Sequence, residues 1–72
     1  MEEVSIRTEF IKLDAFLKFC GEAGTGGEAK LLVAEERIKV NGEICTARGK
    51  KLYDGDRVAA PGGEYAVRRG KV

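Results

Sequence analysis

The 72-residue sequence contains no histidine and only two cysteines, Cys20 and Cys45. Without histidine, the chain by itself cannot assemble a tetrahedral zinc site or form a Ser-His or Cys-His catalytic pair. Lone cysteines on apolar segments are usually small buried hydrophobic residues, so we expect both thiols to be buried and reduced. We predict neither a metal site nor a cofactor.

Long apolar runs are also absent. No segment approaches the roughly 20 apolar residues that a membrane-spanning helix needs. The first residues, Met1-Glu2-Glu3, are acidic, and no hydrophobic stretch of a signal peptide follows them. We therefore expect a cytoplasmic protein that makes no contact with a membrane.

The small size of the chain limits what it can do. A domain of 72 residues buries only about 60% of the surface that its unfolded chain exposes, which leaves little space for a deep substrate cavity. Hydrophobic residues make up 43% and charged residues 35% of the sequence, the balance of a folded globular protein. We predict a single domain over residues 1–72 and no catalysis.

The charge is divided unevenly along the chain, although the formal net charge is only +1. Residues 1–36 hold four basic and eight acidic residues, a net −4, whereas residues 37–72 hold nine basic and four acidic residues, a net +5. Such asymmetry indicates a partner for the basic half, with nucleic acid as the first candidate. The alternative is that the two halves neutralise each other across the fold.

The first half of the chain predicts one strand and two helices. Apolar residues alternate over residues 4–10, as in a half-buried strand, and then follow a helical spacing over residues 13–20. Gly21 is suited to end this helix of about two turns. The motif Thr25-Gly26-Gly27-Glu28 fits a capping box and predicts a second helix over residues 26–36. The two helices would form a hairpin.

The second half returns to the two-residue period of β-strands. Residues 38–45 contain Asn41-Gly42 between two short strands, and this dipeptide favours the type I′ turn of a hairpin. Two further turns and a last strand are predicted at residues 53–56, 61–63 and 65–67. This order predicts an α+β fold in which a two-helix hairpin packs on a small, mostly antiparallel sheet of short strands.

Two patterns look like chemical sites but fit a structural role better. Residues 24–29 have the spacing of a dinucleotide fingerprint, yet they follow a helix rather than a strand, so we predict a turn and a helix cap. Asp54 and Asp56 flank Gly55 and are typical of a turn in which carboxylates bond the local backbone. An enzyme would also need a concave pocket of metabolite size, which we do not expect.

Basic side chains gather in and after the predicted hairpin. Lys39 lies on its first strand, and Arg48, Lys50 and Lys51 follow its second strand. If this segment is extended, Arg48 and Lys50 point to the same side. Such a cluster can follow a phosphodiester chain, because each cation replaces a condensed counterion.

Four short motifs occur in order along the chain: Lys12-Leu13-Asp14-Ala15-Phe16-Leu17-Lys18, Ala29-Lys30-Leu31-Leu32, Ile38-Lys39-Val40-Asn41-Gly42-Glu43 and Gly55-Asp56-Arg57-Val58. Together they resemble the S4-type RNA-binding domain, the small α-L motif first known from ribosomal protein S4. The resemblance covers residues 12–60. It is strongest to the short stand-alone bacterial members, the YaaA/YbcJ type, which share the runs Gly26-Gly27-Glu28-Ala29-Lys30 and Arg48-Gly49-Lys50-Lys51.

The resemblance implies a non-enzymatic protein that binds structured RNA, with ribosomal RNA as the first candidate and transfer RNA as the second. It implies a small ribosome-associated or ribosome-assembly factor, and we expect a monomer. Because the sequence offers no aromatic stacking platform, shape and phosphate contacts should dominate. The alternative is an adaptor that docks its basic face on an acidic protein surface.

The expected RNA-binding residues follow from the basic cluster and the resemblance. Many family members begin the second helix with Ser-Arg, whereas this chain has Gly26-Gly27-Glu28. Backbone N–H groups at this helix start could still contact a phosphate, but we give the basic side chains more weight than the glycines. The primary residues are Lys30, Lys39, Arg48, Lys50 and Lys51, and the secondary ones are Lys18 and Asn41. Asn41 is required by its turn whatever the function.

Overall fold

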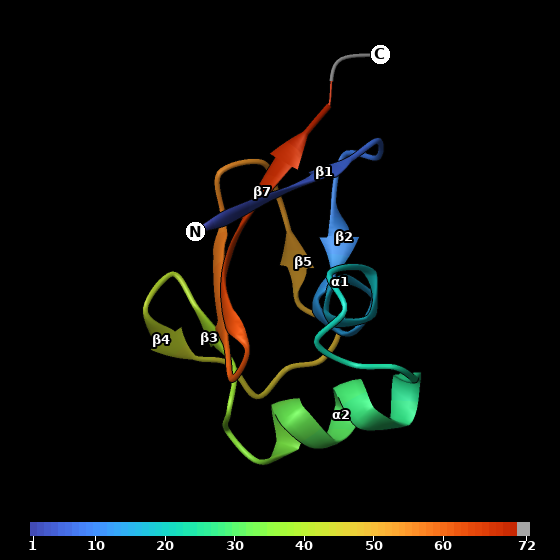
Figure 1. Cartoon of the computed structure of the whole chain (residues 1–72), viewed down its shortest axis with the longest axis vertical. Helices are drawn as coiled ribbons and strands as arrows, with labels where there is room; N and C mark the ends of the chain where they lie inside the picture. The colour runs from blue at the N-terminus through green and yellow to red at the C-terminus, as the bar shows by residue number, and fades with distance from the viewer. Residues whose placement is uncertain (71–72) are drawn as a thin grey trace.

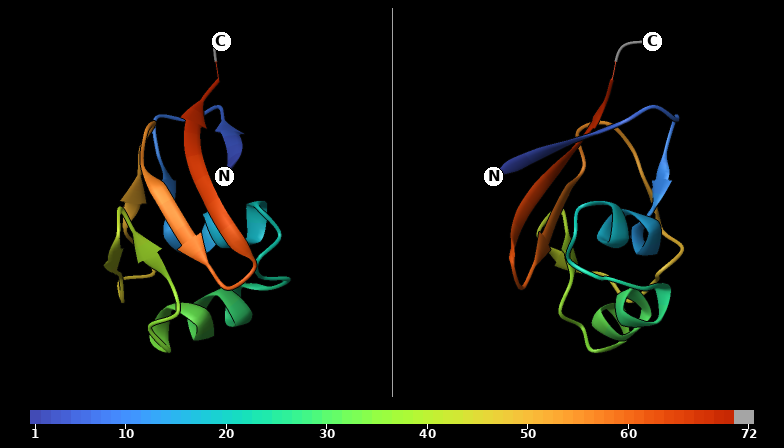
Figure 2. Two further views of the ribbon diagram at one scale, coloured as in Figure 1. Left: turned by 60° about the vertical axis from the view of Figure 1, so that its left-hand side comes forward. Right: turned by 45° about the vertical axis from the view of Figure 1, so that its right-hand side comes forward.

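A computed structural model describes residues 1–70 of the chain. Within these residues the elements are β1 (Glu2–Ile6), β2 (Ile11–Lys12), α1 (Leu13–Phe19), α2 (Gly26–Ala34), β3 (Lys39–Val40), β4 (Glu43–Ile44), β5 (Lys51–Leu52), β6 (Arg57–Ala60) and β7 (Gly63–Arg69). Five strands form one sheet in the order β1-β7-β6-β3-β4, while β2 and β5 form a separate small sheet (Figure 1). Both helices lie on the same side of the five-stranded sheet (Figure 2).

The five-stranded sheet is mixed. Its strands β3, β4, β6 and β7 pair antiparallel, whereas β1 pairs parallel with β7, from Glu2 opposite Tyr65 to Ile6 opposite Arg69. A parallel pair needs a long connection, and here nearly the whole chain supplies it. The predicted α+β fold, a helical hairpin on a mostly antiparallel sheet, is confirmed.

The first strand is shorter than predicted. It ends at Ile6, and residues 7–9 form a bend before the chain enters β2. The Thr8 hydroxyl donates a hydrogen bond of 2.7 Å to the carbonyl of Phe10. Such a bond to the backbone two residues away stabilises a bend in competition with a strand. The alternation over residues 4–10 therefore predicted a strand correctly as far as Ile6 and wrongly for the residues after it.

Both helices begin close to where the sequence predicts. α1 ends before Gly21, whose φ of 86° suits the residue that terminates a helix. At the start of α2, the Thr25 hydroxyl accepts a hydrogen bond of 3.1 Å from the backbone N–H of Glu28. The Glu28 carboxylate accepts from the N–H of Gly24, at 3.4 Å, and not from Thr25 as a capping box requires.

The second helix ends at Ala34, two residues earlier than predicted. Glu36 adopts a left-handed conformation with φ of 60°. Its N–H donates to the carbonyl of Val33 and that of Arg37 donates to Leu32, both at 3.1 Å. This bonding pattern is a Schellman motif, which terminates a helix by satisfying its last carbonyls.

The core lies between the helices and the sheet. Its fully buried members from α1 are Leu13, Phe16 and Leu17, and the ring of Phe16 meets that of Tyr65 edge to face at 6.3 Å. The strands contribute Val4, Ile6, Val40, Leu52, Val58 and Val67. Burial of a side chain such as Phe16 contributes about 1.5–3 kcal/mol. Within residues 1–70, no helix is long and apolar enough to cross a membrane.

The two cysteines differ from expectation. Cys20 and Cys45 are both free thiols, but each is only partly buried at the margin of the core. Burial and the nearby carboxylate of Glu22 raise the pKa of Cys20, while backbone hydrogen bonding partly opposes this. The prediction that both cysteines are buried therefore holds only in part: both pack on the core, but neither is buried completely.

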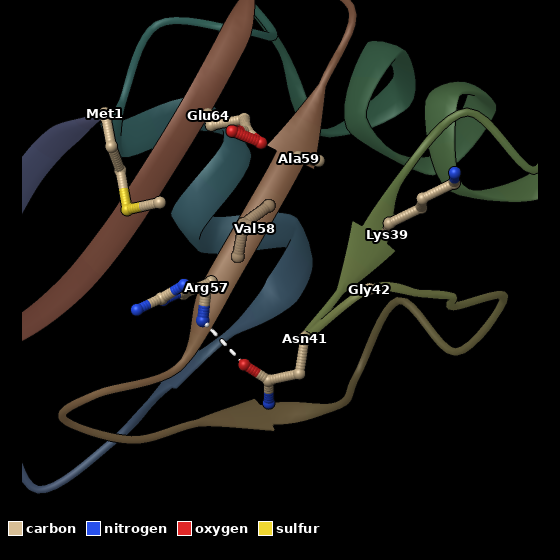
Figure 3. Close-up of a pocket in the computed structure, with 8 residues that line it drawn as sticks. All are labelled: Met1, Lys39, Asn41, Gly42, Arg57, Val58, Ala59 and Glu64. Atoms are coloured by element: carbon tan, nitrogen blue, oxygen red, sulfur yellow. Dashed lines mark hydrogen bonds between the residues drawn. The ribbon is translucent and has the colours of Figure 1, made fainter.

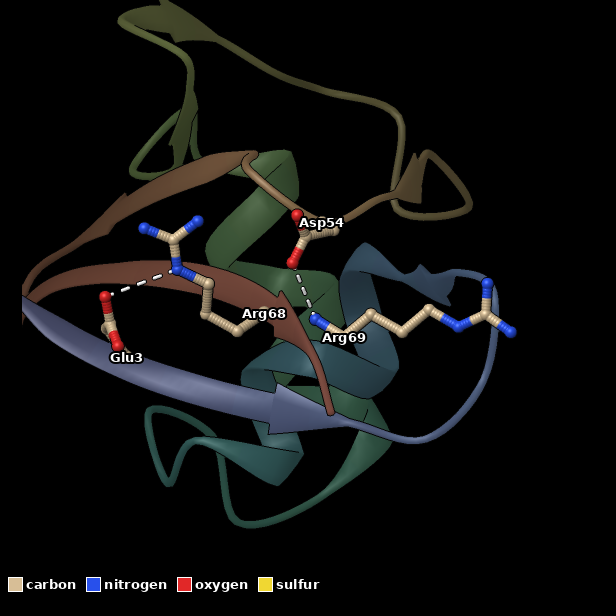
Figure 4. Close-up of polar contacts among 4 residues, drawn as sticks. All are labelled: Glu3, Asp54, Arg68 and Arg69. Atoms are coloured by element: carbon tan, nitrogen blue, oxygen red, sulfur yellow. Dashed lines mark hydrogen bonds and ion pairs between the residues drawn. The ribbon is translucent and has the colours of Figure 1, made fainter. Parts of the chain in front are cut away.

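The carboxylates of Asp54 and Asp56 organise the turn between β5 and β6. Asp56 accepts a hydrogen bond of 2.8 Å from the N–H of Tyr53, and the turn contains Gly55 with φ of 94°. Asp54 accepts one of 2.8 Å from the N–H of Arg69 at the end of β7 (Figure 4). The predicted structural role of both is confirmed, although the partner of Asp54 is distant in sequence.

Candidate nucleic-acid interface

The cations that follow the hairpin lie on a tight turn. We call residues 47–51 the basic turn. The N–H of Lys50 donates to the carbonyl of Ala47 at 3.0 Å, so Arg48 and Gly49 occupy the two central positions. The expectation that an extended segment points Arg48 and Lys50 to one side is therefore wrong, because the chain reverses direction between them.

The first turn of α1 holds the basic turn by its backbone. The N–H of Leu13 donates to the carbonyl of Lys50 at 2.8 Å, and the N–H of Asp14 donates to that of Arg48 at 3.0 Å. The N-cap residue, Lys12, provides no side-chain hydrogen bond. Carbonyls of the basic turn therefore satisfy amides that a helix start leaves without partners. The backbone of the turn is fixed while its long side chains remain exposed.

The small sheet extends this surface. In the pairing of β2 with β5, Lys12 lies opposite Lys51, and both are exposed. Sequence reasoning missed Lys12 as a candidate, because its proximity to Lys51 depends on a strand pairing that no local pattern predicts. It also missed an aromatic pair beside these lysines: the exposed Tyr53 and the half-buried Phe10, whose ring centroids lie 5.9 Å apart.

No carboxylate among residues 1–70 forms an ion pair with the cations of the basic turn. Within residues 1–70 the one ion pair is between Glu3 and Arg68, with nitrogen and oxygen 3.3 Å apart (Figure 4). Both of its side chains are about half exposed or more, so it contributes little to stability. Among the described residues, this pair is therefore the one close ion pair through which the acidic and basic halves of the chain neutralise each other.

Lys39 lies on a different surface from the basic turn. Its neighbour Val40 is buried toward the helices, so Lys39 points to the opposite face of the sheet. There it borders an open groove of about 680 Å³ together with Arg57 and Glu64 (Figure 3). We expected no concavity of this size. Arg57, which sequence reasoning missed, is the second cation that lines this groove.

Asn41 is committed to the fold. Its Oδ1 accepts a hydrogen bond of 2.9 Å from the N–H of Arg57, and its Nδ2 donates one of 3.1 Å to Asp56. Its φ of 52° and that of Gly42, 87°, are those of the predicted type I′ turn. The side chain therefore joins the hairpin turn to the start of β6, and both ends of its amide are occupied.

The remaining predicted residues lie on the helices. Lys18 is exposed in the last turn of α1 and, four residues after Asp14, shares a face with it. The basic turn contacts the first turn of α1, so Lys18 is about one helical turn, or ~6 Å, further along the axis. Lys30 is exposed on α2. Within residues 1–70, no three His, Cys, Asp or Glu side chains are grouped to hold a metal ion.

The fold agrees with the comparisons to known proteins. A model of the S4 domain family matches residues 4–68, so the chain belongs to that family. It is 44% identical over 65 residues to a protein of Bacillus subtilis (strain 168) described as "Probable ribosome maturation protein RlbA". The alignment covers 89% of this chain and 92% of that protein, so the two have similar lengths. The resemblance to the short stand-alone S4-type domain is confirmed.

Proposed function

We propose that residues 1–72 form one RNA-binding domain that binds structured RNA, with ribosomal RNA as its first target, and that it acts as a monomer without catalysis. Membership of the S4 domain family supports RNA as the ligand. The description of the Bacillus subtilis relative as a probable ribosome maturation protein supports a role in ribosome assembly.

The observation that carries this proposal is the basic turn. Arg48, Lys50 and Lys51 are exposed on a backbone that the amides of α1 hold in place, and no carboxylate lies within 4.0 Å of their cationic groups among residues 1–70. A rigid cluster of this kind binds phosphates at low entropic cost, because little backbone has to be ordered on binding. Lys12 adds a fourth cation at the same place.

The geometry favours a structured RNA over a flexible strand. A turn whose backbone is fixed beside a helix suits a ligand of fixed shape, such as a folded RNA. Lys18, on the face of α1 that carries Asp14, extends the surface along α1, and Lys30 is a further predicted contact on α2. Lys39, on the opposite face of the sheet, is the predicted contact that fits a single continuous surface least well.

The test is a double charge reversal of the basic turn. Arg48→Glu with Lys50→Glu should abolish binding to ribosomal RNA fragments in filter-binding assays while circular dichroism shows an intact fold. Arg7→Glu with Arg37→Glu is the matched control, because it changes the net charge equally at exposed positions outside the turn. Transfer RNA serves as the second probe.

A salt series adds a quantitative criterion. If each of the five primary residues predicted from the sequence contacts one phosphate, the slope of log affinity against log salt concentration should be roughly −3.5 to −4.5. Unchanged affinity in the folded Arg48/Lys50 variant would reject the site, as would equal losses in that variant and its control. A slope near zero for the wild-type chain would reject phosphate-driven binding altogether.

A further inference from the structure

The small sheet brings two aromatic residues together at the surface. In the pairing of β2 with β5, Ile11 lies opposite Leu52, and one step outward the same register sets Phe10 opposite Tyr53. Their ring centroids lie 5.9 Å apart, with the ring planes inclined by 48°. Figure 1 shows the two strands side by side, although they are separated by both helices and the hairpin in sequence.

Tyr53 is exposed but held in position. The tyrosine is 45% exposed, whereas its neighbour Leu52 is fully buried and anchors the strand to the core. Its backbone N–H donates to Asp56, and its ring packs against the half-buried ring of Phe10. An exposed ring whose backbone and neighbouring ring hold it in place offers a preformed face on which a base can stack.

Cations lie on the same face as the two rings. Side chains two residues apart along a strand share a face, which places Lys51 with Tyr53 and Lys12 with Phe10. The Lys51 ammonium lies 4.7 Å from the centroid of the Phe10 ring, a cation–π arrangement. Lys51 also belongs to the basic turn, so the aromatic pair continues directly from the proposed phosphate-binding surface.

We propose that Tyr53, supported by Phe10, is a stacking platform for one unpaired base of the bound RNA, and that Lys51 and Lys12 contact its flanking phosphates. The inference rests on the proposed function and narrows its ligand to a paired stem interrupted by a bulged or looped-out nucleotide. The basic turn contacts the stem backbone, and the exposed surface of Tyr53 receives the base. Stacking of a base on an aromatic side chain contributes about 1–3 kcal/mol and requires no particular base.

The experiment uses the full chain and three RNA stems of equal length: fully paired, carrying one bulged adenosine, and carrying an abasic bulge. Tyr53→Leu should weaken binding of the bulged stem by about 5- to 150-fold, the equivalent of 1–3 kcal/mol. Its affinity for the paired and abasic stems should stay within about twofold of the wild-type affinity. Tyr53→Phe, which keeps the ring, should bind the bulged stem with the affinity of the wild-type chain.

A matched control and an optical signal complete the test. Phe19→Leu removes another exposed aromatic ring, 61% exposed at the end of α1, and should not discriminate between the stems. With 2-aminopurine as the bulged base, the wild-type chain should quench its fluorescence and Tyr53→Leu should not. Circular dichroism confirms that each variant is folded.

The outcomes separate this inference from the proposed function. If the wild-type chain binds all three stems equally, or if Tyr53→Leu weakens all three equally, the stacking platform is refuted while RNA binding stands. If the wild-type chain binds none of the stems, nor ribosomal or transfer RNA, both proposals fail together. A loss confined to the bulged stem, absent in Phe19→Leu, supports the platform.

Discussion

Replacing Asn41 tests whether this side chain stabilises the fold or contacts RNA. Its amide makes two hydrogen bonds, to the N–H of Arg57 at 2.9 Å and to Asp56 at 3.1 Å. A hydrogen bond contributes about 0.5–1.5 kcal/mol net, and the exposed position favours the lower part of that range. Asn41→Gly should therefore lower the free energy of unfolding by about 1–2 kcal/mol.

A second variant isolates the backbone contribution. Asn41 has a φ of 52°, which glycine adopts without strain and alanine does not. Asn41→Ala should cost a further 1–2 kcal/mol or so. For a domain of this size, 1 kcal/mol shifts the melting temperature by roughly 4–8 °C, so the two variants should melt in the order Gly above Ala, both below wild type.

The assay combines thermal unfolding with RNA binding. Melting temperatures come from circular dichroism, and affinities are measured well below the melting temperature of the weakest variant. Asn41→Gly with Asp56→Ala should destabilise by less than the sum of the single changes, because the two side chains share a hydrogen bond. Asn41→Gly should keep wild-type affinity for RNA.

The reasoning would be refuted by the opposite pattern. If Asn41→Gly melts with the wild type but loses tenfold or more in RNA affinity, Asn41 acts as an RNA contact and its hydrogen bonds contribute nothing. If Asn41→Ala is as stable as Asn41→Gly, the argument from positive φ is wrong.

Two further predictions concern Glu22, whose carboxylate accepts hydrogen bonds from the Tyr65 hydroxyl and the Gly62 N–H. A Cβ at Gly62 would collide with that carboxylate, so Gly62→Ala should lower the urea midpoint, but not in a Glu22→Ala background. The bond to Glu22, aided by burial, raises the pKa of Tyr65 to about 12, above the unfolded value near 10. Because the native state keeps a proton that the unfolded state loses, stability should fall from pH 10 toward pH 12, and less so in Tyr65→Phe; equal falls would contradict this.

Local signals predicted the elements that depend on neighbours in sequence. The Asn41-Gly42 turn, the Thr25 cap and the termination of α1 at Gly21 are all as predicted, because each needs only a few residues and their φ preferences. The same signals failed where a local bond opposed the pattern. The bend closed by Thr8 ended β1 early, and the left-handed Glu36 ended α2 early.

The candidate site was only partly predictable, because its geometry depends on contacts between residues that are distant in sequence. The sequence shows that the site is basic, and it predicts Arg48, Lys50 and Lys51 as contacts. Their arrangement depends on hydrogen bonds between the basic turn and the first turn of α1, which join residues more than 30 positions apart. No short-range pattern reports such contacts.

The sequence by itself determined the fold class, the family and the type of residue available for binding, because hydrophobic period, turn residues and charge are local properties. Only the tertiary structure decided which of those residues share a surface. Pairing of β2 with β5 joined Lys12, Phe10 and Tyr53 to the basic turn, and the pleat of β3 turned Lys39 to the opposite face. Both depend on strand register, which is set by burial of the whole core and not by any one segment.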